Sequence, residues 1–293
     1  MRARGANPVY LPEVSFPPRL VATADLGEAL EDTDLVVAAA PSHGTREMLR
    51  RAAPLVRPGS TVISATKGLE RGSLFRMSEV VRQELGDRVR VAVLSGPSFA
   101  VELARELPTA VSIASADAAA VHLVQTELRA PYFRLYGTDD VVGVELGGAL
   151  KNVIAIAAGV VEGLGLGHNA GAGLITRGLA EISRLACAAG ARRETLAGLA
   201  GLGDLVLTCT GTFSRNRRVG IELAAGRAVS DVVAGMKMVA EGVGTTEAAL
   251  ALAARYGIEL PIAVQVGELL AGRREPRQAL DELMLRPQRT EVG

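Results

Sequence analysis

The sequence predicts an α/β domain with a doubly wound, mostly parallel sheet, followed by an all-helical domain. In the first half, short apolar runs alternate with helical segments, as in parallel sheets covered by helices. From about Gly143 onward the apolar period changes toward about 3.6 residues, which indicates helices. The length of 293 residues allows two medium domains. We therefore expect a first domain over residues 1–142 and a second over residues 143–293.

Composition excludes several functional classes. Apolar residues make up 48% and charged residues 22%, and the formal net charge is zero, so no basic surface is expected for nucleic acid. The two cysteines, Cys187 and Cys209, indicate neither a disulfide framework nor a metal site. Apolar runs such as 153–161 are too short to cross a membrane. Arg2 and Arg4 precede no apolar signal segment, so we expect a cytoplasmic protein.

The first half can be taken in order from its apolar runs and turn residues. Residues 1–19 hold four prolines and are expected to be irregular, followed by a strand at 19–24 and a helix at 25–31 capped by Asp25. The continuous apolar run 35–40 is typical of a strand buried on both faces. We expect further strands at 61–65, 91–94, 109–114 and 132–136, and helices at 45–53, 74–85, 99–106 and 116–128.

The second half is predicted to be helical throughout. Its abundant alanine and glycine, with no tryptophan, fit closely packed helices. Gly190 is a natural helix C-cap. The expected helices span 148–161, 173–189, 192–200, 214–225, 229–236, 245–256, 261–270 and 276–284.

Polar or glycine-rich turns follow three of the predicted strands. Parallel sheets bind ligands outside the carboxyl ends of their strands, so these turns should line one crevice. Lys67 is the one cation among them and suits an anionic ligand, with a surface lysine as the alternative. Ser98 could contact a ligand or cap the helix after it. His43 is more easily read as a capping or solvated residue than as a base. The turns are residues 41–43, 66–68 and 95–98.

The stretch 147–159 is the first candidate for chemistry. Lys151 and Asn152 are its only strongly polar residues. Burying an ammonium lowers the pKa of a lysine, and a nearby cation lowers it further. A lysine shifted in this way can exchange protons near neutral pH. The alternative is a lysine that reaches from a helix end into water.

Three polar groups follow in the helical half. Asp204 ends a glycine-rich turn, and could be functional or simply an N-cap. Residues 214–218, Ser-Arg-Asn-Arg-Arg, begin a helix, where arginines oppose the helix dipole unless an anion is bound. A solvated basic turn is the alternative. Glu241 could hold a ribose hydroxyl or lie at the surface as an ordinary carboxylate.

One expected motif is absent from its usual place. A dinucleotide-binding fold opens with a strand and a G-x-G-x-x-G turn that holds the pyrophosphate at a helix N-terminus. No such turn precedes the first predicted strand here. The glycine-rich spans 163–167 and 201–203 follow helices instead of strands, so they lack the structural context of that motif.

Five segments together resemble the bacterial NAD(P)-dependent glycerol-3-phosphate dehydrogenase family. The resemblance runs from about Asn7 to Leu285, and five blocks in this order and spacing are highly specific. The family interconverts dihydroxyacetone phosphate and sn-glycerol 3-phosphate with NAD(P)H and supplies the backbone of phospholipids. It implies a Rossmann-type sheet and NAD or NADP as cofactor. The segments are ATKGLE at 65–70, SGPSFA at 95–100, GALKN at 148–152, AGLGDL at 200–205 and SRNRR at 214–218.

The resemblance also implies roles for individual residues. Lys151 falls on the proton donor and acceptor, and Lys67 on a contact to both substrate and cofactor. Arg215 falls on a substrate contact that also lies near the cofactor. The remaining substrate positions are Gly96, Ser98, Asp204, Ser214 and Asn216, and the remaining cofactor positions are Ala100, Val239 and Glu241.

These roles fit the chemistry of a carbonyl reduction. Hydride addition to a carbonyl leaves an alkoxide, which needs a proton and positive surroundings. Lys151 would supply the proton, while Lys67 lowers its pKa and stabilises the oxyanion. Asp204 would orient an ammonium, and Arg215 with Asn216 would hold the phosphate.

The sequence departs from the family at its start. In the family, the position of Asn7 follows a first strand, the glycine-rich turn, a helix and a second strand. We therefore expect this chain to bind NAD(P)H poorly or not at all, and we expect an exposed sheet edge at a strand such as 35–40. Either an upstream start or an inactive remnant would explain the departure.

Two other functions stay open at this level. The chain could be a non-catalytic protein that binds a phosphorylated ligand, or a dehydrogenase acting on a 3-hydroxy acid. The expected partner is a small phosphorylated substrate, with neither nucleic acid nor membrane insertion, and a homodimer is compatible with the sequence. The choice between NADH and NADPH is usually made after the second strand of such folds.

Overall fold

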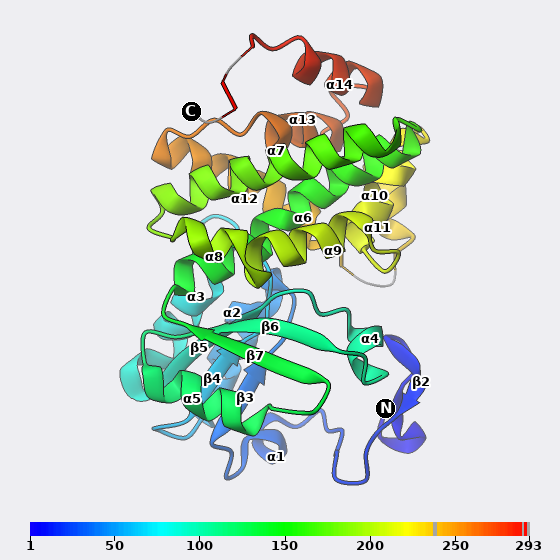
Figure 1. The fold of residues 1–293 in the computed structure, drawn as a ribbon. Helices are drawn as coiled ribbons and strands as arrows, with labels where there is room; N and C mark the ends of the chain where they lie inside the picture. Colours follow the sequence, from blue (N-terminus) through cyan, green and yellow to red (C-terminus); the bar gives the residue numbers. More distant parts are fainter. Residues whose placement is uncertain (237–238, 289, 292–293) are drawn as a thin grey trace.

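A computed structural model describes residues 1–236, 239–288 and 290–291. The chain forms a sheet-containing part, which lies in the lower half of Figure 1, and a helical part above it. The helix α6, Val141–Gly163, begins where the sheet ends and runs into the helical part. The division of the chain at residue 142 stays a prediction.

The N-terminal residues differ from expectation. Residues 1–19 include two short antiparallel strands, β1 (Ala6–Asn7) and β2 (Leu11–Ser15), where irregular structure was predicted. The strand predicted at 19–24 is wrong, because this segment pairs with no neighbouring strand and leaves Leu20 and Val21 exposed. The helix that follows, α1 (Leu26–Leu30), begins as predicted, with the Asp25 carboxylate accepting from the backbone of Gly27 at 2.7 Å.

The main sheet has five strands in the order β3-β4-β5-β6-β7. All neighbours are parallel except β5 and β6. Leu35, Thr61 and Arg90 are aligned at the start of β3, β4 and β5, so these strands finish at one edge of the sheet. The strands are β3 (Leu35–Ala38), β4 (Thr61–Ser64), β5 (Arg90–Ser95), β6 (Thr109–Ala114) and β7 (Phe133–Thr138).

Strand β3 was expected to be buried on both faces and also to form an exposed sheet edge, and the structure bears out only the second. Val37 is 51% exposed, so the strand is not buried on both faces. It lies at the edge of the five-stranded sheet, which is the exposed edge that the departure from the family pattern predicted.

Helices α2 (Ser42–Ala52), α3 (Met77–Leu85) and α5 (Ala118–Glu127) pack against this sheet. Helix α3 begins three residues later than predicted, because Leu74 has a left-handed φ of 63° and Glu79 caps the backbone N–H of Arg76. Helix α4 (Ala100–Ala104) ends early, since Glu106 has a left-handed φ of 58°.

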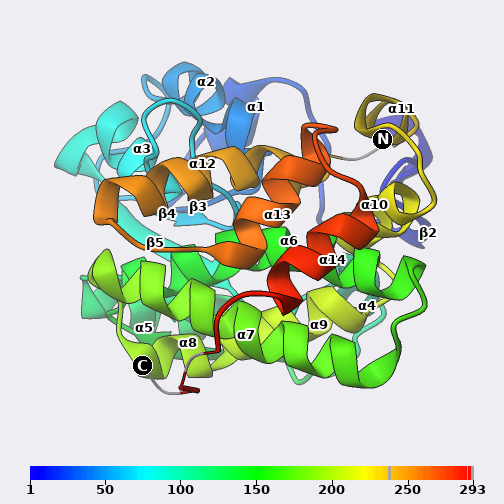
Figure 2. The ribbon, with the colours of Figure 1, turned by 90° about the horizontal axis from the view of Figure 1, so that it is seen from above.

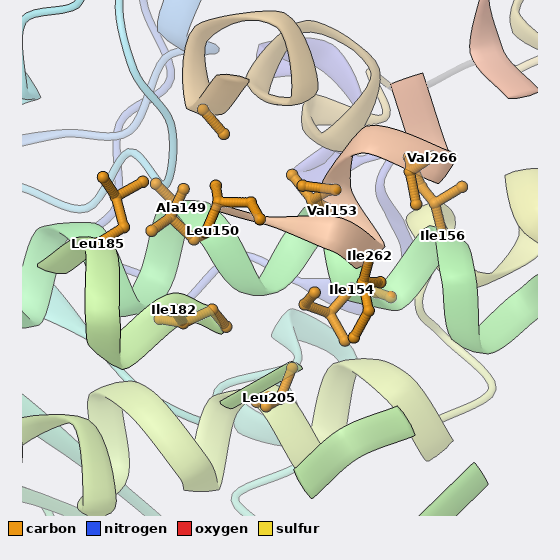
Figure 3. Close-up of a cluster of buried hydrophobic side chains, with 14 of the residues drawn as sticks. Ala149, Leu150, Val153, Ile154, Ile156, Ile182, Leu185, Leu205, Ile262 and Val266 are labelled. Atoms are coloured by element: carbon orange, nitrogen blue, oxygen red, sulfur yellow. The ribbon is translucent and has the colours of Figure 1, made fainter. Parts of the chain in front are cut away.

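The helical part surrounds α6. In the view from above, α7, α12 and α13 lie around it (Figure 2). Figure 3 shows side chains of α6 packed against α7, α9 and α13. The helices are α7 (Gly167–Ala188), α8 (Arg193–Ala197), α9 (Asp204–Thr210), α10 (Arg215–Ala224), α11 (Val229–Ala234), α12 (Glu241–Tyr256), α13 (Pro261–Leu270) and α14 (Pro276–Met284).

Helix α6 is much longer than the predicted 148–161. By length and composition it could cross a membrane, but 83% of its apolar window is buried within the protein, as in a core helix. Glycines bring α10 against it, because a Cβ on Gly220 would collide with the backbone carbonyl of Ile156. The predicted close packing of helices is confirmed here. Gly190, with φ of 100°, lies just past the end of α7, as its predicted role requires.

The predicted fold class is confirmed. The parallel strands with their helices form a Rossmann-like N-terminal domain, and the C-terminal domain is helical. The glycine-rich span 163–167 joins α6 to α7, so it links two helices, as its sequence context indicated.

Candidate active site

Lys151 lies in the middle of α6 and is only 5% exposed. It is therefore not a helix-end lysine reaching into water. Its Nζ donates a hydrogen bond to Thr208 Oγ1 at 2.8 Å and forms an ion pair with Asp204. Burial, and next the positive charge of Lys67, lower the pKa of Lys151 to about 7, although Asp204 opposes this shift. The side chain is thus poised to gain or lose a proton near neutral pH.

The Asp204 carboxylate bridges two ammonium groups that come from different domains. One oxygen faces Lys151, and the other accepts from Lys67 Nζ at 2.7 Å. Lys67 Nζ also donates to the carbonyl of Gly96 at 2.8 Å. When Lys151 is protonated, two cations and one buried anion give this cluster a net charge of +1. An anionic group, or an oxygen that becomes anionic during reaction, would be stabilised beside it.

Small residues allow this cluster to form. Residues Leu199–Gly203 make a π-helical turn that leads into α9. A Cβ on Gly147 would lie 2.7 Å from the carbonyl oxygen of Ala200, so glycine is required for this turn to reach α6. Asp204 therefore enters the first turn of α9 facing the lysines, and it is not the N-cap that the alternative interpretation offered.

A chain of amide hydrogen bonds extends the site from Lys67. Asn152 Nδ2 donates to the carbonyl of Lys67 at 3.2 Å, and Asn216 Nδ2 donates to Asn152 Oδ1 at 2.9 Å. The backbone N–H of Gly242 then donates to Asn216 Oδ1 at 3.0 Å. Because both amides are buried and paired, their orientation is fixed, and Asn216 connects the cluster to the start of α12.

The start of α10 presents one arginine without a carboxylate. Arg217 pairs with Glu162 at 2.5 Å, and Arg218 lies 3.8 Å from Glu222. Arg215 is exposed and forms no ion pair within the described residues. Ser214 caps the helix, its Oγ accepting from the backbone N–H of Arg217 at 3.2 Å. A guanidinium and a helix N-terminus together favour a bound anion.

Glu241 joins the two domains at another point. Its carboxylate accepts from the backbone N–H of Ser42 at 3.0 Å and from Ser42 Oγ at 2.5 Å. Gly68 packs against this pair, since a Cβ there would lie 2.8 Å from the Ser42 Cβ. Glu241 is therefore not a free surface carboxylate.

The other candidates are placed less centrally. Ser98 does not cap α4, because its hydroxyl donates to the carbonyl of Gly96 at 3.0 Å. His43 is exposed on the first turn of α2, in line with a solvated residue. Ala100 and Val239 are exposed, at the start of α4 and just before α12.

Sequence reasoning did not assign site roles to Ser42, Ser95, Asn152 and Thr208. Thr208 follows Asp204 by one helical turn, which was a usable signal for a shared helix face. Asn152 was visible as the second polar residue of its apolar stretch. Ser95 Oγ lies 3.5 Å from Asp204 and directly precedes Gly96. Ser42 lies in the turn 41–43, which was expected to line the crevice, but its partner Glu241 is far away in the sequence.

Comparison with known proteins shows the family of this chain. Residues 1–121 match the family model described as NAD-dependent glycerol-3-phosphate dehydrogenase N-terminus, and residues 140–281 match the model of its C-terminus. The glycerol-3-phosphate dehydrogenase [NAD(P)+] of Acidobacterium capsulatum is 54% identical, with 99% of this chain and 88% of the relative covered. The enzyme of the same name from Koribacter versatilis is 50% identical, with 99% and 87% covered.

A solved structure agrees over almost the whole chain. The crystal structure of glycerol-3-phosphate dehydrogenase from Coxiella burnetii has a TM-score of 0.94 and 44% identity, covering 98% of this chain and 87% of that one. The family models, the related sequences and the solved structure thus all identify the same family. The chain belongs to the NAD-dependent glycerol-3-phosphate dehydrogenase family.

Proposed function

We propose that this protein is an NAD(P)-dependent dehydrogenase that interconverts dihydroxyacetone phosphate and sn-glycerol 3-phosphate for glycerophospholipid synthesis. The observation that carries the proposal is the buried cluster in which Asp204 bridges Lys151 and Lys67. Family membership favours this enzyme over a non-catalytic phosphate-binding protein.

Lys151 would be the acid in reduction and the base in oxidation. The nicotinamide cofactor, when bound, supplies or accepts the hydride. Lys151 Nζ protonates the alkoxide that forms at the former carbonyl carbon, and in the reverse direction it removes the hydroxyl proton. Lys67 adds a second positive charge beside the developing oxyanion. Asp204 fixes the position of both ammonium groups, which reduces the reorganisation needed during proton transfer.

The phosphate of the substrate would lie at the start of α10. Arg215 supplies a guanidinium that no carboxylate of the described residues neutralises, and Ser214 and Asn216 flank it on the same turn. A helix N-terminus with a free guanidinium favours binding of a dianionic phosphate. Gly96 and Ser98 would shape the substrate loop from the opposite domain.

The residues fit one part of a dinucleotide cofactor. Lys67, Ala100, Arg215, Val239 and Glu241 are the proposed cofactor contacts. Glu241 is a carboxylate at the domain junction, and it already accepts two hydrogen bonds there, as it would from a hydroxyl-bearing ligand. Among the described residues, no strand is followed by the G-x-G-x-x-G turn that holds a pyrophosphate. Poor or absent binding of NAD(P)H by this chain stays a prediction.

The proposal also covers where the enzyme acts and what it binds. We place the enzyme in the cytoplasm, acting on a small phosphorylated substrate, without nucleic acid or membrane insertion. A homodimer is compatible with this function.

The experiment is a substrate comparison with saturating NADH or NADPH. Dihydroxyacetone phosphate should drive oxidation of the cofactor, while the keto forms of 3-hydroxy acids should not. In Arg215→Ala, the KM for dihydroxyacetone phosphate should rise roughly tenfold to a hundredfold, because a charged hydrogen bond is lost. Arg218→Ala, a neighbouring arginine already near Glu222, is the matched control and should keep the KM. Equal turnover of 3-hydroxy acids would contradict the proposal.

A further inference from the structure

Residues 67–78 connect the end of β4 to the first turn of α3, and we call this segment the strap. It belongs in sequence to the sheet-containing domain. Its residue Leu69 is nevertheless buried in the apolar core of the helical domain, and Leu74 packs against that core. The strap therefore reaches the helical domain through Leu69 and Leu74. Its residues Phe75 and Glu70 stay on the sheet-containing domain, where Phe75 packs on the apolar core and Glu70 pairs with Arg46 of α2. The strap begins with a residue of the active site, Lys67.

The first end of the strap is fixed to α6 and α9. The carbonyl of Lys67 accepts from Asn152 at 3.2 Å, and its ammonium pairs with Asp204 at 2.7 Å. These contacts belong to the site already described.

The second end is fixed to α6 by Glu145. This carboxylate accepts from the backbone N–H of Ser78 at 2.7 Å, from Ser78 Oγ at 2.6 Å and from Arg76 Nη1 at 2.8 Å. Its side chain is only 4% exposed. Burial raises the pKa of Glu145, while Arg76 and the Ser78 donors oppose that shift. A buried carboxylate stays ionised only when strong hydrogen-bond or ion-pair partners surround it. The partners of Glu145 all come from the sheet-containing domain.

Glu145 and Asn152 are seven positions apart, which is two turns of one helix face. Gly148 lies between them on that face, where a Cβ would collide with Ser95 Oγ and approach Lys67 Cγ at 3.7 Å. One face of α6 thus holds both ends of the strap and leaves room for the lysine between them. The same helix carries Lys151.

We infer that Glu145 is a positioning residue, which by anchoring the strap to α6 sets how closely Lys67 and its domain approach Lys151. This role rests on the function proposed above. Glu145 touches neither lysine within the described contacts, so it acts through the strap and does not take part in proton transfer itself. The charged or titratable groups that face Lys151 are Lys67, Asp204 and Cys209.

Loss of the Glu145 anchor should change the pKa of Lys151 in a defined direction. If the anchor is lost, Lys67 is held less closely and water reaches the cluster, and both changes raise the pKa of Lys151. A direct electrostatic role of the Glu145 carboxylate predicts the opposite, because removal of a negative charge lowers the pKa of a lysine. A role in stability alone predicts no change.

The experiment measures the pKa of Lys151 directly in the ligand-free protein. The chain has three lysines, at positions 67, 151 and 237, so competitive acetylation across pH, read by mass spectrometry, resolves each one. In Glu145→Ala, the pKa of Lys151 should rise by roughly one unit. Glu145→Gln keeps the shape and part of the hydrogen bonding, so it should fold where Ala does not, and its pKa should rise by a smaller amount.

Glu79→Gln is the matched control. Glu79 pairs with the same arginine at 3.0 Å and caps the same helix start, but its hydrogen bonds and ion pair stay within the sheet-containing domain. This variant should leave the pKa of Lys151 unchanged. An unchanged or lowered pKa in a folded Glu145 variant would overturn the inference.

The two proposals can fail separately. If the protein does not reduce dihydroxyacetone phosphate, the proposed function fails, while the titration of Lys151 still reports on the anchor. If the enzyme is active, the pH limb of kcat/KM that belongs to Lys151 should move with the acetylation pKa in each Glu145 variant.

Discussion

At the scale of single residues, the pKa of Lys151 should govern the pH dependence of both reaction directions. With a pKa of about 7, the side chain is largely neutral above that pH and protonated below it. Oxidation of glycerol 3-phosphate needs the neutral base, so its kcat/KM should rise with pH and level off above about 7. Reduction needs the protonated acid, so its kcat/KM should fall above the same pH.

The measurement is a pair of pH–rate profiles with one enzyme preparation. Lys67→Met removes a neighbouring positive charge, so the limb should move to higher pH in both directions. Profiles in which the two directions change in the same sense with pH would be incompatible with a single acid–base group.

At the scale of elements, the contact of α6 with α10 depends on the absence of a side chain. Gly220→Ala would place a Cβ into the backbone of α6, so we expect a loss of roughly 1–3 kcal/mol in the free energy of unfolding. Urea denaturation measures it. Gly173→Ala in α7 is the control, since a Cβ there meets no atom within 4 Å. That variant should be neutral or stabilised by up to roughly 1 kcal/mol.

A buried carboxylate joins α7 to α13. Glu181 accepts from the backbone N–H groups of Ile262 and Ala263 at 2.7 and 3.3 Å, and burial raises its pKa to about 7. Because the folded pKa lies above the ordinary glutamate value of 4.5, the folded state binds the proton more tightly. The associated stability is present below pH 4.5 and is lost as pH rises to about 7.

Glu181→Gln should therefore remove a pH-dependent difference of roughly 3 kcal/mol between pH 4.5 and 8. Thermal or urea unfolding at several pH values measures this difference relative to the original chain. Glu247→Gln, at an exposed position of α12, is the control and should leave the pH dependence as it was. Parallel pH curves for Glu181→Gln and the original chain would contradict the assignment.

The ends of a helix could be predicted from the sequence where the period of its apolar residues and its capping residues indicated the same bounds. Helices α13 and α14 begin and end as predicted, and Asp25 caps α1 as its sequence indicated. The strand expected at 19–24 failed because a strand also needs a neighbour, which local sequence does not report. Helix α6 was predicted too short, because Gly143, Gly147 and Gly148 weaken the helical pattern and are required by contacts with other elements.

At the scale of the whole molecule, the site exists only because two domains meet. Lys67 and Gly96 come from strand ends of the sheet, while Lys151 and Asp204 come from two helices of the other domain. The residues alone marked Lys151, Lys67 and Asp204 as candidates and left an alternative open for each, and the family resemblance gave them their roles. The bridging of both lysines by one carboxylate, and the contacts of Ser42 and Glu145, join residues too far apart in sequence for any local pattern to reveal.

The most direct test of the account replaces the buried lysine. In Lys151→Met, a similar shape without the ammonium, kcat for reduction of dihydroxyacetone phosphate should fall by at least about 100-fold, because proton transfer is lost. The dissociation constant of glycerol 3-phosphate, measured by calorimetry, should change far less, since Arg215 is intact. A Lys151→Met enzyme that keeps its turnover of dihydroxyacetone phosphate would contradict the account.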